Sequence, residues 1–327
     1  EENNTLVALE TESYSAFGQV DYSLTDDLVL VGGLRYTREN KDFVGNVYQN
    51  ENTNDRIIEI DTSTPSLEFT EQSNDQNLWS AKLQLEYSVG NSLYYAGINR
   101  GVKAGSFNAP LFGGFSFYEP EELTSYEAGL KHSFMQGSGV FNANVFYYDY
   151  SDYQSFSWVN NAGVVTNEEA SFSGVELEVF LTPTDSLDVI VNFSYTDAVV
   201  EDLEVASGYF ADTTPPFTPE YQASAMLRYN WDAFNGNMAA QLSASYQSET
   251  FHNARNFTAH QIDSYATADA RLTWVDGQDK WSLAAYVDNL FDSDHELIGF
   301  DVTGFYGTSQ ISYAKPRTYG VTVRRNF

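Results

Sequence analysis

Apolar and polar residues alternate along most of this chain, which puts one kind of side chain on each face of an extended strand. Between Trp79 and Val89, the odd positions read Trp, Ala, Leu, Leu, Tyr and Val, and the even positions read Ser, Lys, Gln, Glu and Ser. The same period recurs along the chain and predicts thirteen strands, at residues 13–24, 27–39, 77–89, 92–104, 121–134, 138–151, 171–182, 185–199, 218–231, 236–250, 263–276, 279–291 and 315–327.

The lengths of the strands and of their connections point to a membrane. Most predicted strands exceed ten residues, whereas strands in water-soluble domains have about five or six, and a tilted strand needs about nine to eleven to cross a bilayer. Short turns such as Gly90-Asn91 alternate with long segments at 40–76, 105–120, 152–170, 200–217, 251–262 and 292–314. Short periplasmic turns and long extracellular loops are typical of outer-membrane barrels. The predicted fold is therefore an all-β, antiparallel transmembrane β-barrel.

Aromatic residues fall at two heights along these strands. Near the short turns lie Tyr22, Tyr87, Phe134, Trp231, Trp274, Trp281 and Phe327, and near the long segments lie Tyr36, Trp79, Tyr126, Tyr147, Tyr195, Tyr246 and Tyr319. Two such belts mark the two interfaces of a membrane. A water-soluble β-sandwich or propeller would explain the alternation, but not the long strands, the alternating connections and the belts together.

Composition narrows the possible functions. The formal net charge of −30 argues against nucleic acid as a partner. Cysteine is absent, which excludes thiol catalysis and thiolate–metal sites in this chain. No run of 18 or more apolar residues indicates a transmembrane helix. The four histidines show no metalloprotease spacing and no nucleophile elbow is present, so we expect neither an enzyme nor a resident cofactor or metal.

The direction of the strands indicates an incomplete barrel. If the last strand runs towards the periplasm, the first of thirteen strands also runs in that direction. Bacterial single-chain barrels have an even number of strands and begin in the periplasm. Residues 1–327 are therefore expected to be the C-terminal portion of a larger barrel, preceded by an odd number of strands.

Several segments resemble the TonB-dependent outer-membrane receptors of Gram-negative bacteria. They are Asn99-Arg-Gly-Val-Lys-Ala-Gly-Ser-Phe-Asn108, Tyr126-Glu-Ala-Gly-Leu-Lys131, Gly174-Val-Glu-Leu-Glu178, Phe217-Thr-Pro219, Asp288-Asn-Leu-Phe-Asp292 and Tyr319-Gly-Val-Thr-Val323. Val102, Ser106 and Arg325 depart from the residues usual in that family. The order and spacing of the segments carry the resemblance over residues 14–327.

The resemblance implies a 22-stranded barrel whose lumen holds an N-terminal plug, with the plug and the first strands absent from this chain. It also implies active transport of a scarce small-molecule ligand, driven by the TonB–ExbB–ExbD complex through the missing N-terminal part. Ferric siderophores lead as cargo, with cobalamin, haem or oligosaccharide as alternatives, and a passive porin-like channel as another. Lipid bilayer and lipopolysaccharide are the expected surroundings.

Candidate ligand-binding residues lie near the extracellular rim, where aromatic surfaces and a few cations would suit an aromatic or metal-chelate ligand. They are Arg100, Lys103, Phe107, Phe112, Phe115, Phe117, Tyr118, Phe156, Trp158, Phe305 and Tyr306. Packing between neighbouring loops is the alternative role for these aromatic residues.

Two further sets of charged residues are not expected to bind ligand. Charges on the polar face of the strands are expected to face the lumen and to contact water or the plug: Arg35, Lys82, Glu86, Glu127, Lys131, Arg228, Asp269 and Arg271. The eight acids of segment 40–76, and the group Asp292, Asp294, Glu296 and Asp301 beside His295, are expected to form solvated acidic surfaces. Calcium binding is the alternative for these acids.

Overall fold

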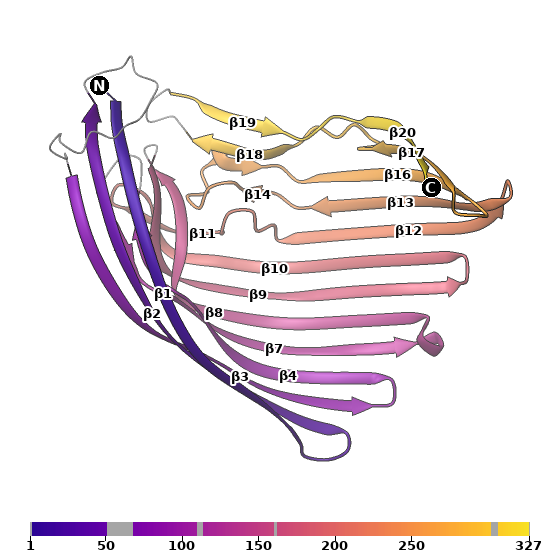
Figure 1. Ribbon diagram of the computed structural model, residues 1–327, viewed down its shortest axis with the longest axis horizontal. Helices are drawn as coiled ribbons and strands as arrows, with labels where there is room; N and C mark the ends of the chain where they lie inside the picture. The colour runs from indigo at the N-terminus through magenta and orange to yellow at the C-terminus, as the bar shows by residue number, and fades with distance from the viewer. Residues whose placement is uncertain (1, 51–67, 110–113, 160–161, 302–306, 327) are drawn as a thin grey trace.

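The computed structural model describes residues 2–50, 68–109, 114–159, 162–301 and 307–326, and nearly all of them belong to strands (Figure 1). Thirteen strands follow one another in sequence order along one strongly curved antiparallel sheet, which confirms the predicted number and neighbours. They are β1 (Glu2–Ser23), β2 (Leu28–Asn50), β3 (Glu68–Val89), β4 (Ser92–Lys103), β7 (Glu121–Phe134), β8 (Gly139–Val159), β9 (Ala162–Thr184), β10 (Leu187–Ala206), β12 (Tyr221–Ala233), β13 (Gly236–Gln247), β16 (Tyr265–Asp276), β17 (Trp281–Asp288) and β20 (Thr318–Arg325). Within these described ranges, no helix is long and apolar enough to cross a membrane.

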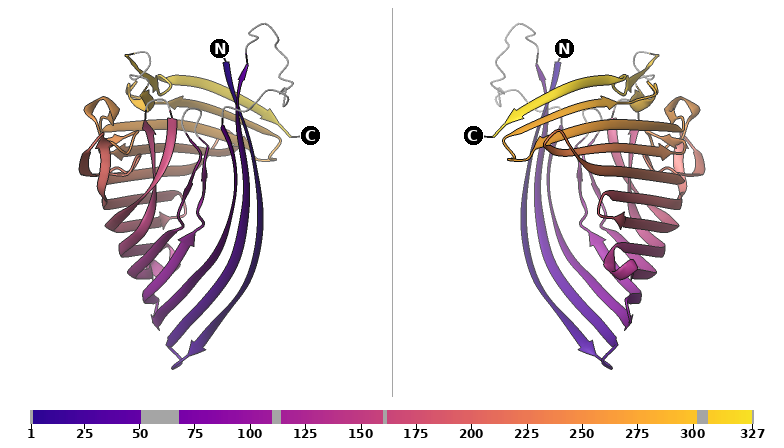
Figure 2. Two further views of the ribbon diagram at one scale, coloured as in Figure 1. Left: turned by 90° about the vertical axis from the view of Figure 1, so that its left-hand side faces the viewer. Right: turned by 90° about the vertical axis from the view of Figure 1, so that its right-hand side faces the viewer.

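The sheet is an open trough rather than a closed barrel (Figure 2). Strands β1 and β20 form its two edges, with β1 bonded to β2 and β20 bonded to β17. Short turns join the strands at one end, on the right in Figure 1, whereas β1–β3 rise far beyond the others at the opposite end. That opposite end is the extracellular one in the predicted orientation.

The register between strands confirms that the sheet has one apolar and one polar face. A single cross-strand ladder joins Tyr22, Leu30, Leu85, Ala96, Ala128, Val145, Val175 and Tyr195. The next ladder joins Glu86, Tyr95, Gly129, Asn144, Glu176, Ser194, Gln222 and Gln247. The predicted lumenal charges share the face of Glu86, so the apolar face is the one available to lipid.

The long connecting segments were predicted as loops, but most of them form β-hairpins. Strands β2 and β3 stay paired from Leu28 to Val47, well into the segment predicted as a loop. Additional short strands are β5 (Ser106–Asn108), β6 (Ser116–Tyr118), β11 (Tyr209–Thr213), β14 (Thr250–Phe251), β15 (Gln261–Ile262), β18 (Glu296–Asp301) and β19 (Ser309–Tyr313). Above the membrane these hairpins no longer have a lipid-facing side, so the strict alternation ends while the backbone ladder persists.

A small apolar core lies above the membrane-spanning part of the sheet. Ala170, Val200, Leu203 and Ala254 are buried together, with Tyr150, Tyr153, Phe172 and Val205 packed against them. The core joins β8, β9 and β10 to the connection between β13 and β16. This packing holds the extracellular segments in fixed positions around the mouth of the trough.

Candidate functional site

The hairpin of β5 and β6 folds onto the inner face of β2 through aromatic rings. Phe43 of β2, which is 1% exposed, stacks on Phe107 with ring centroids 4.8 Å apart. Phe115 meets Phe43 edge-on at 5.3 Å, and Phe117 meets Phe107 at 5.2 Å. Tyr118 stacks on Phe117 at 6.5 Å. The aromatic rings of this segment therefore pack largely against one another and against Phe43.

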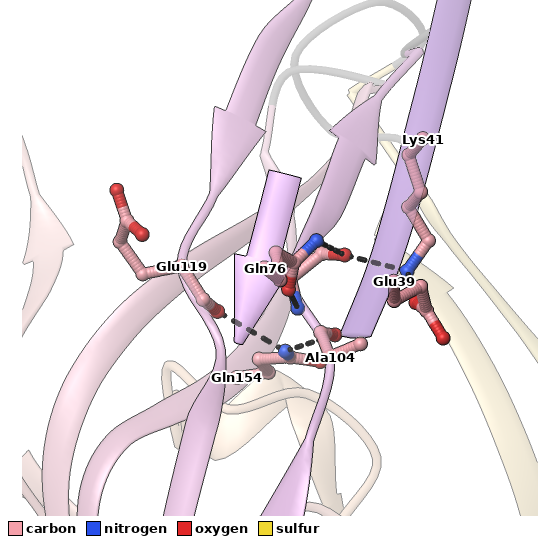
Figure 3. Close-up of polar contacts among 7 residues, drawn as sticks. Glu39, Lys41, Gln76, Ala104, Glu119 and Gln154 are labelled. Carbon is pink, nitrogen blue, oxygen red and sulfur yellow. Dashed lines mark hydrogen bonds and ion pairs between the residues drawn. The ribbon is translucent and has the colours of Figure 1, made fainter. Parts of the chain in front are cut away.

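Polar side chains of β2 and β3 hold the start of this hairpin by its backbone (Figure 3). The Gln76 amide donates to the Gly105 carbonyl at 3.0 Å and accepts the Gly105 N–H at 2.7 Å. Lys41 Nζ donates to the same carbonyl at 2.7 Å and forms an ion pair with Glu39. A buried amide that pairs both ways with a backbone imitates a neighbouring strand, so it fixes Gly105 in place.

Contacts with β8 and β9 hold the hairpin as well, at both of its ends. The Gln154 amide donates to the Ala104 carbonyl at 3.0 Å and to the Glu119 carbonyl at 3.2 Å (Figure 3). Asn108 donates to the Val165 carbonyl at 2.9 Å and accepts the Val165 N–H at 3.1 Å. The β5–β6 hairpin is therefore a fixed part of the mouth.

A separate cavity of about 320 Å³ opens where four extracellular segments meet. Its walls come from the tip of β8, from Pro216 and Phe217, from His252 and Asn253, and from Ile298 to Phe300 of β18. Phe156, Phe217 and Phe300 are about half exposed around it. Exposed apolar rings that converge on one cavity make it a candidate binding site.

Unusual backbone geometry shapes this cavity. The register of β8 against β9 shifts between Tyr150 and Tyr153, where Asp152 has a φ of 56°. Phe217 also has a φ of 56°, and its N–H donates to the Phe251 carbonyl at 2.8 Å. Non-glycine residues in this region carry strain, which proteins retain mainly at functional sites.

The cavity is electrically neutral along its walls. The ten described residues that line it include no lysine, arginine, aspartate or glutamate. Burial, together with Glu121 and Tyr150, raises the pKa of Tyr153 to about 12, so this phenol stays protonated at neutral pH. The His252 ring packs against His260 with centroids 5.0 Å apart, and Gly299 lies so close to His252 that a Cβ would clash. Stacking and apolar contact are the interactions that these walls offer.

The structure corrects the predicted position of Arg100. Its partners in the register are Ala81 and Thr124, which place it on the apolar, outward face. Its guanidinium lies 4.2 Å from the centre of the Trp79 ring and forms an ion pair of 2.5 Å with Glu122. Period-2 counting from Ile98 already assigns this face, but the position of Arg100 near the end of its strand, before segment 105–120, suggested the rim instead. Arg100 therefore lies on the lipid-facing side of the sheet, at the boundary of the membrane.

Five of the remaining predicted residues belong to the hairpin or to the cavity. Phe107, Phe115, Phe117 and Tyr118 belong to the fixed hairpin, and Phe156 lines the cavity. Lys103 is exposed on the inner face opposite Glu121. Trp158 of β8 pairs with Gly163 of β9. Phe112, Phe305 and Tyr306 lie outside the described residues.

Sequence reasoning missed most of the cavity. Tyr153, Phe217, His252 and Ile298 line it but were not among the predicted ligand-binding residues. Phe217 was visible in the sequence only as part of the Phe217-Thr-Pro219 segment. Four distant segments must be brought together before these side chains share a wall, which a linear pattern does not encode.

The acidic group beside His295 is structural in its described part. Asp292 accepts the Arg317 N–H at 2.8 Å, and the His295 ring stacks on Tyr265 at 3.8 Å. The side chain of Asp301 lies outside the described ones. Across the described ranges, no group of three or more histidine and acidic residues is arranged to hold a metal ion.

Comparison with known proteins identifies the family. A family model described as TonB dependent receptor-like, beta-barrel, matches residues 3–290. The chain belongs to this family. It is accordingly an outer-membrane barrel of a transport receptor and not an enzyme, as the sequence predicted.

Solved structures of receptors from this family share the fold. The ferric yersiniabactin uptake receptor FyuA from Yersinia pestis is similar with a TM-score of 0.81 and 19% identity over 99% of this chain and 47% of its own. The ferric-catecholate import receptor Fiu from E. coli K12 has a TM-score of 0.73 and 17% identity, over 98% of this chain and 45% of its own. The siderophore receptor PiuA from Acinetobacter baumannii has a TM-score of 0.71 and 16% identity, over 97% of this chain and 43% of its own. The chain spans about half the length of these receptors.

Proposed function

We propose that this chain is the ligand-receiving barrel portion of an active uptake receptor whose cargo is a ferric siderophore. The observation that carries the proposal is the cavity between β8, Phe217, His252 and β18, whose aromatic walls stand at the extracellular end of the sheet. Similar receptors from other bacteria are named for ferric siderophores, which supports the same cargo here. Transport would draw energy from TonB–ExbB–ExbD.

We also propose that an N-terminal plug and nine further strands complete a 22-stranded barrel. The two edge strands, β1 and β20, carry unpaired backbone groups that lipid does not tolerate. Residues 1–327 expressed alone are therefore expected to aggregate, as sedimentation and heat-modifiable gel mobility would reveal. A monodisperse, heat-modifiable barrel made from these residues alone would refute this part of the proposal.

The cavity is tested by ligand binding to the intact receptor. Phe156→Ala and Phe217→Ala should each weaken binding of a ferric siderophore by about tenfold, because each removes a stacking surface worth roughly 0.5–1.5 kcal/mol beyond its buried area. Equilibrium dialysis with radioactive iron measures the affinity. Tyr209→Ala is the matched control, since Tyr209 is an exposed aromatic residue of β11 outside the cavity.

Several outcomes would contradict the proposed cargo. Unchanged affinity in both cavity variants would remove the cavity from ligand recognition. Tight binding of a glycan, cobalamin or haem, with no affinity for any ferric siderophore, would redirect the proposal to that ligand. Steady ion conductance of the intact protein in planar bilayers would favour a passive channel.

A further inference from the structure

Three cations among the described residues of the extracellular side, Arg255, Lys41 and Arg100, make contacts with the protein itself. Arg255 lies next to the cavity residues His252 and Asn253, yet its Nε donates to the Val205 carbonyl and its guanidinium stacks over Phe257 at 4.5 Å. Lys41 is bound to Gly105 and Glu39, and Arg100 lies on the outward face with Glu122. These guanidinium and ammonium groups are therefore placed to stabilise the protein rather than an anionic ligand.

The polar side chains of the cavity are also engaged with the protein backbone. Both amide hydrogens of Gln154 are directed to the carbonyls of Ala104 and Glu119. The Asn253 Oδ1 accepts the backbone N–H of Arg255 at 3.0 Å. The amide hydrogens of Gln154, which could otherwise replace the water around a bound anion, are thus already committed. Burying an uncompensated anion costs several kcal/mol.

A negative charge is also held against the cavity wall. Glu121 accepts the backbone N–H of Gln154 at 2.8 Å, directly behind the cavity wall. The chain as a whole carries a formal charge of −30. An anionic ligand approaching this mouth would therefore meet repulsion from the protein, whereas a neutral ligand would not.

From these contacts we infer that the cavity selects ligands that present an electrically neutral aromatic group, and that it discriminates against anionic aromatic chelates. The inference rests on the proposed function and deepens it by naming the class of ferric complex that the receptor takes. Neutral aryl-hydroxamate complexes of Fe³⁺ belong to the accepted class, and anionic catecholate complexes of Fe³⁺ belong to the rejected class. Affinity comes from stacking on Phe156, Phe217 and Phe300.

Three iron complexes, each with three bidentate ligands, separate charge from aromatic character. Ferric tris-benzohydroxamate is neutral and aromatic, ferric tris-catecholate is anionic and aromatic, and ferric tris-acetohydroxamate is neutral and aliphatic. Binding to the intact receptor is measured at pH 8, where an ordinary histidine is neutral. We expect the benzohydroxamate complex to bind at least about tenfold more tightly than either of the other two, with little dependence on salt.

A charge introduced into the wall should invert the charge preference. In Phe156→Lys, the affinity for the catecholate complex should rise and that for the benzohydroxamate complex should fall, so that their ratio changes by about tenfold or more. Tyr209→Lys adds the same charge on an exposed extracellular strand outside the cavity and should leave the ratio unchanged. Equal shifts in both variants would show a general charge effect and overturn the inference.

The outcomes distinguish this inference from the function on which it rests. If the receptor binds and imports ferric complexes but prefers the catecholate complex, the neutral class is wrong and the uptake function stands. Equal binding of the benzohydroxamate and acetohydroxamate complexes would overturn the aromatic part alone. If cells that express the receptor bind and import no ferric complex of any charge, the proposed function fails and the ligand class fails with it.

Discussion

Leu83→Arg is expected to destabilise the membrane-inserted receptor by about 2–4 kcal/mol, because it places a charge near the middle of the lipid-facing surface. Leu83 lies on β3 halfway between Trp79, which belongs to the belt near the long segments, and Tyr87, which belongs to the belt near the short turns. Its register partners Gly32 and Ile98 share the apolar face, and its side chain is 51% exposed to the surroundings of the sheet. Urea unfolding of the intact receptor in lipid vesicles, followed by tryptophan fluorescence, measures the change.

The adjacent residue provides the matched control. Gln84 points to the opposite face, where it donates to Glu86 at 2.6 Å. Gln84→Arg introduces the same side chain beside a carboxylate on the polar face, so its effect should stay within about 0.5 kcal/mol. If the two variants were equally unstable, the assignment of the lipid and lumen faces would be wrong.

Gly105→Val is expected to displace the β5–β6 hairpin and to cost about 1–3 kcal/mol, the usual range for overpacking. A Cβ at residue 105 would lie 2.4 Å from the Tyr118 carbonyl oxygen and 2.8 Å from the Phe117 ring. Moving the backbone to relieve that clash would break both bonds to Gln76. Hydrogen exchange of Ser106 to Asn108 should become much faster, as mass spectrometry of the intact receptor would show.

Gly101→Val serves as the control for this prediction. Gly101 lies on β4, four residues before Gly105. A Cβ at Gly101 would meet only Leu123, at 3.8 Å. Valine also suits a strand, so exchange in the hairpin should remain slow. Rapid exchange in both variants would mean that the bonds to Gly105 do not hold the hairpin.

The contrast between hairpin and cavity revises the view of the extracellular aromatic residues. The segment with the most rings, around Phe107 to Tyr118, is occupied with internal packing and is tied to β2, β3, β8 and β9. The cavity instead uses isolated rings from separate segments. Local packing, the alternative in the sequence interpretation, is the observed role of the described hairpin rings. Ring density in the sequence is therefore a poorer guide to the binding surface than the meeting of several hairpins.

The sequence by itself determined the membrane-spanning part of this protein. The alternation around Leu83, the short turns and the aromatic belts predicted thirteen antiparallel strands, their order and the side that each residue faces. A bilayer imposes a fixed strand length and a period of two, so each strand carries its assignment locally. The motifs added the family, since they depend on order along the chain.

Only the tertiary structure decided what stands above the membrane. There no side of the hairpins faces lipid, and the alternation that marked the strands ends although β2, β3, β8 and β9 continue. The ion pair of Arg100 with Glu122 and its position over the Trp79 ring also appeared only in the structure. The cavity joins residues as distant as Phe156 and Phe300, and non-local packing rather than local pattern places them side by side.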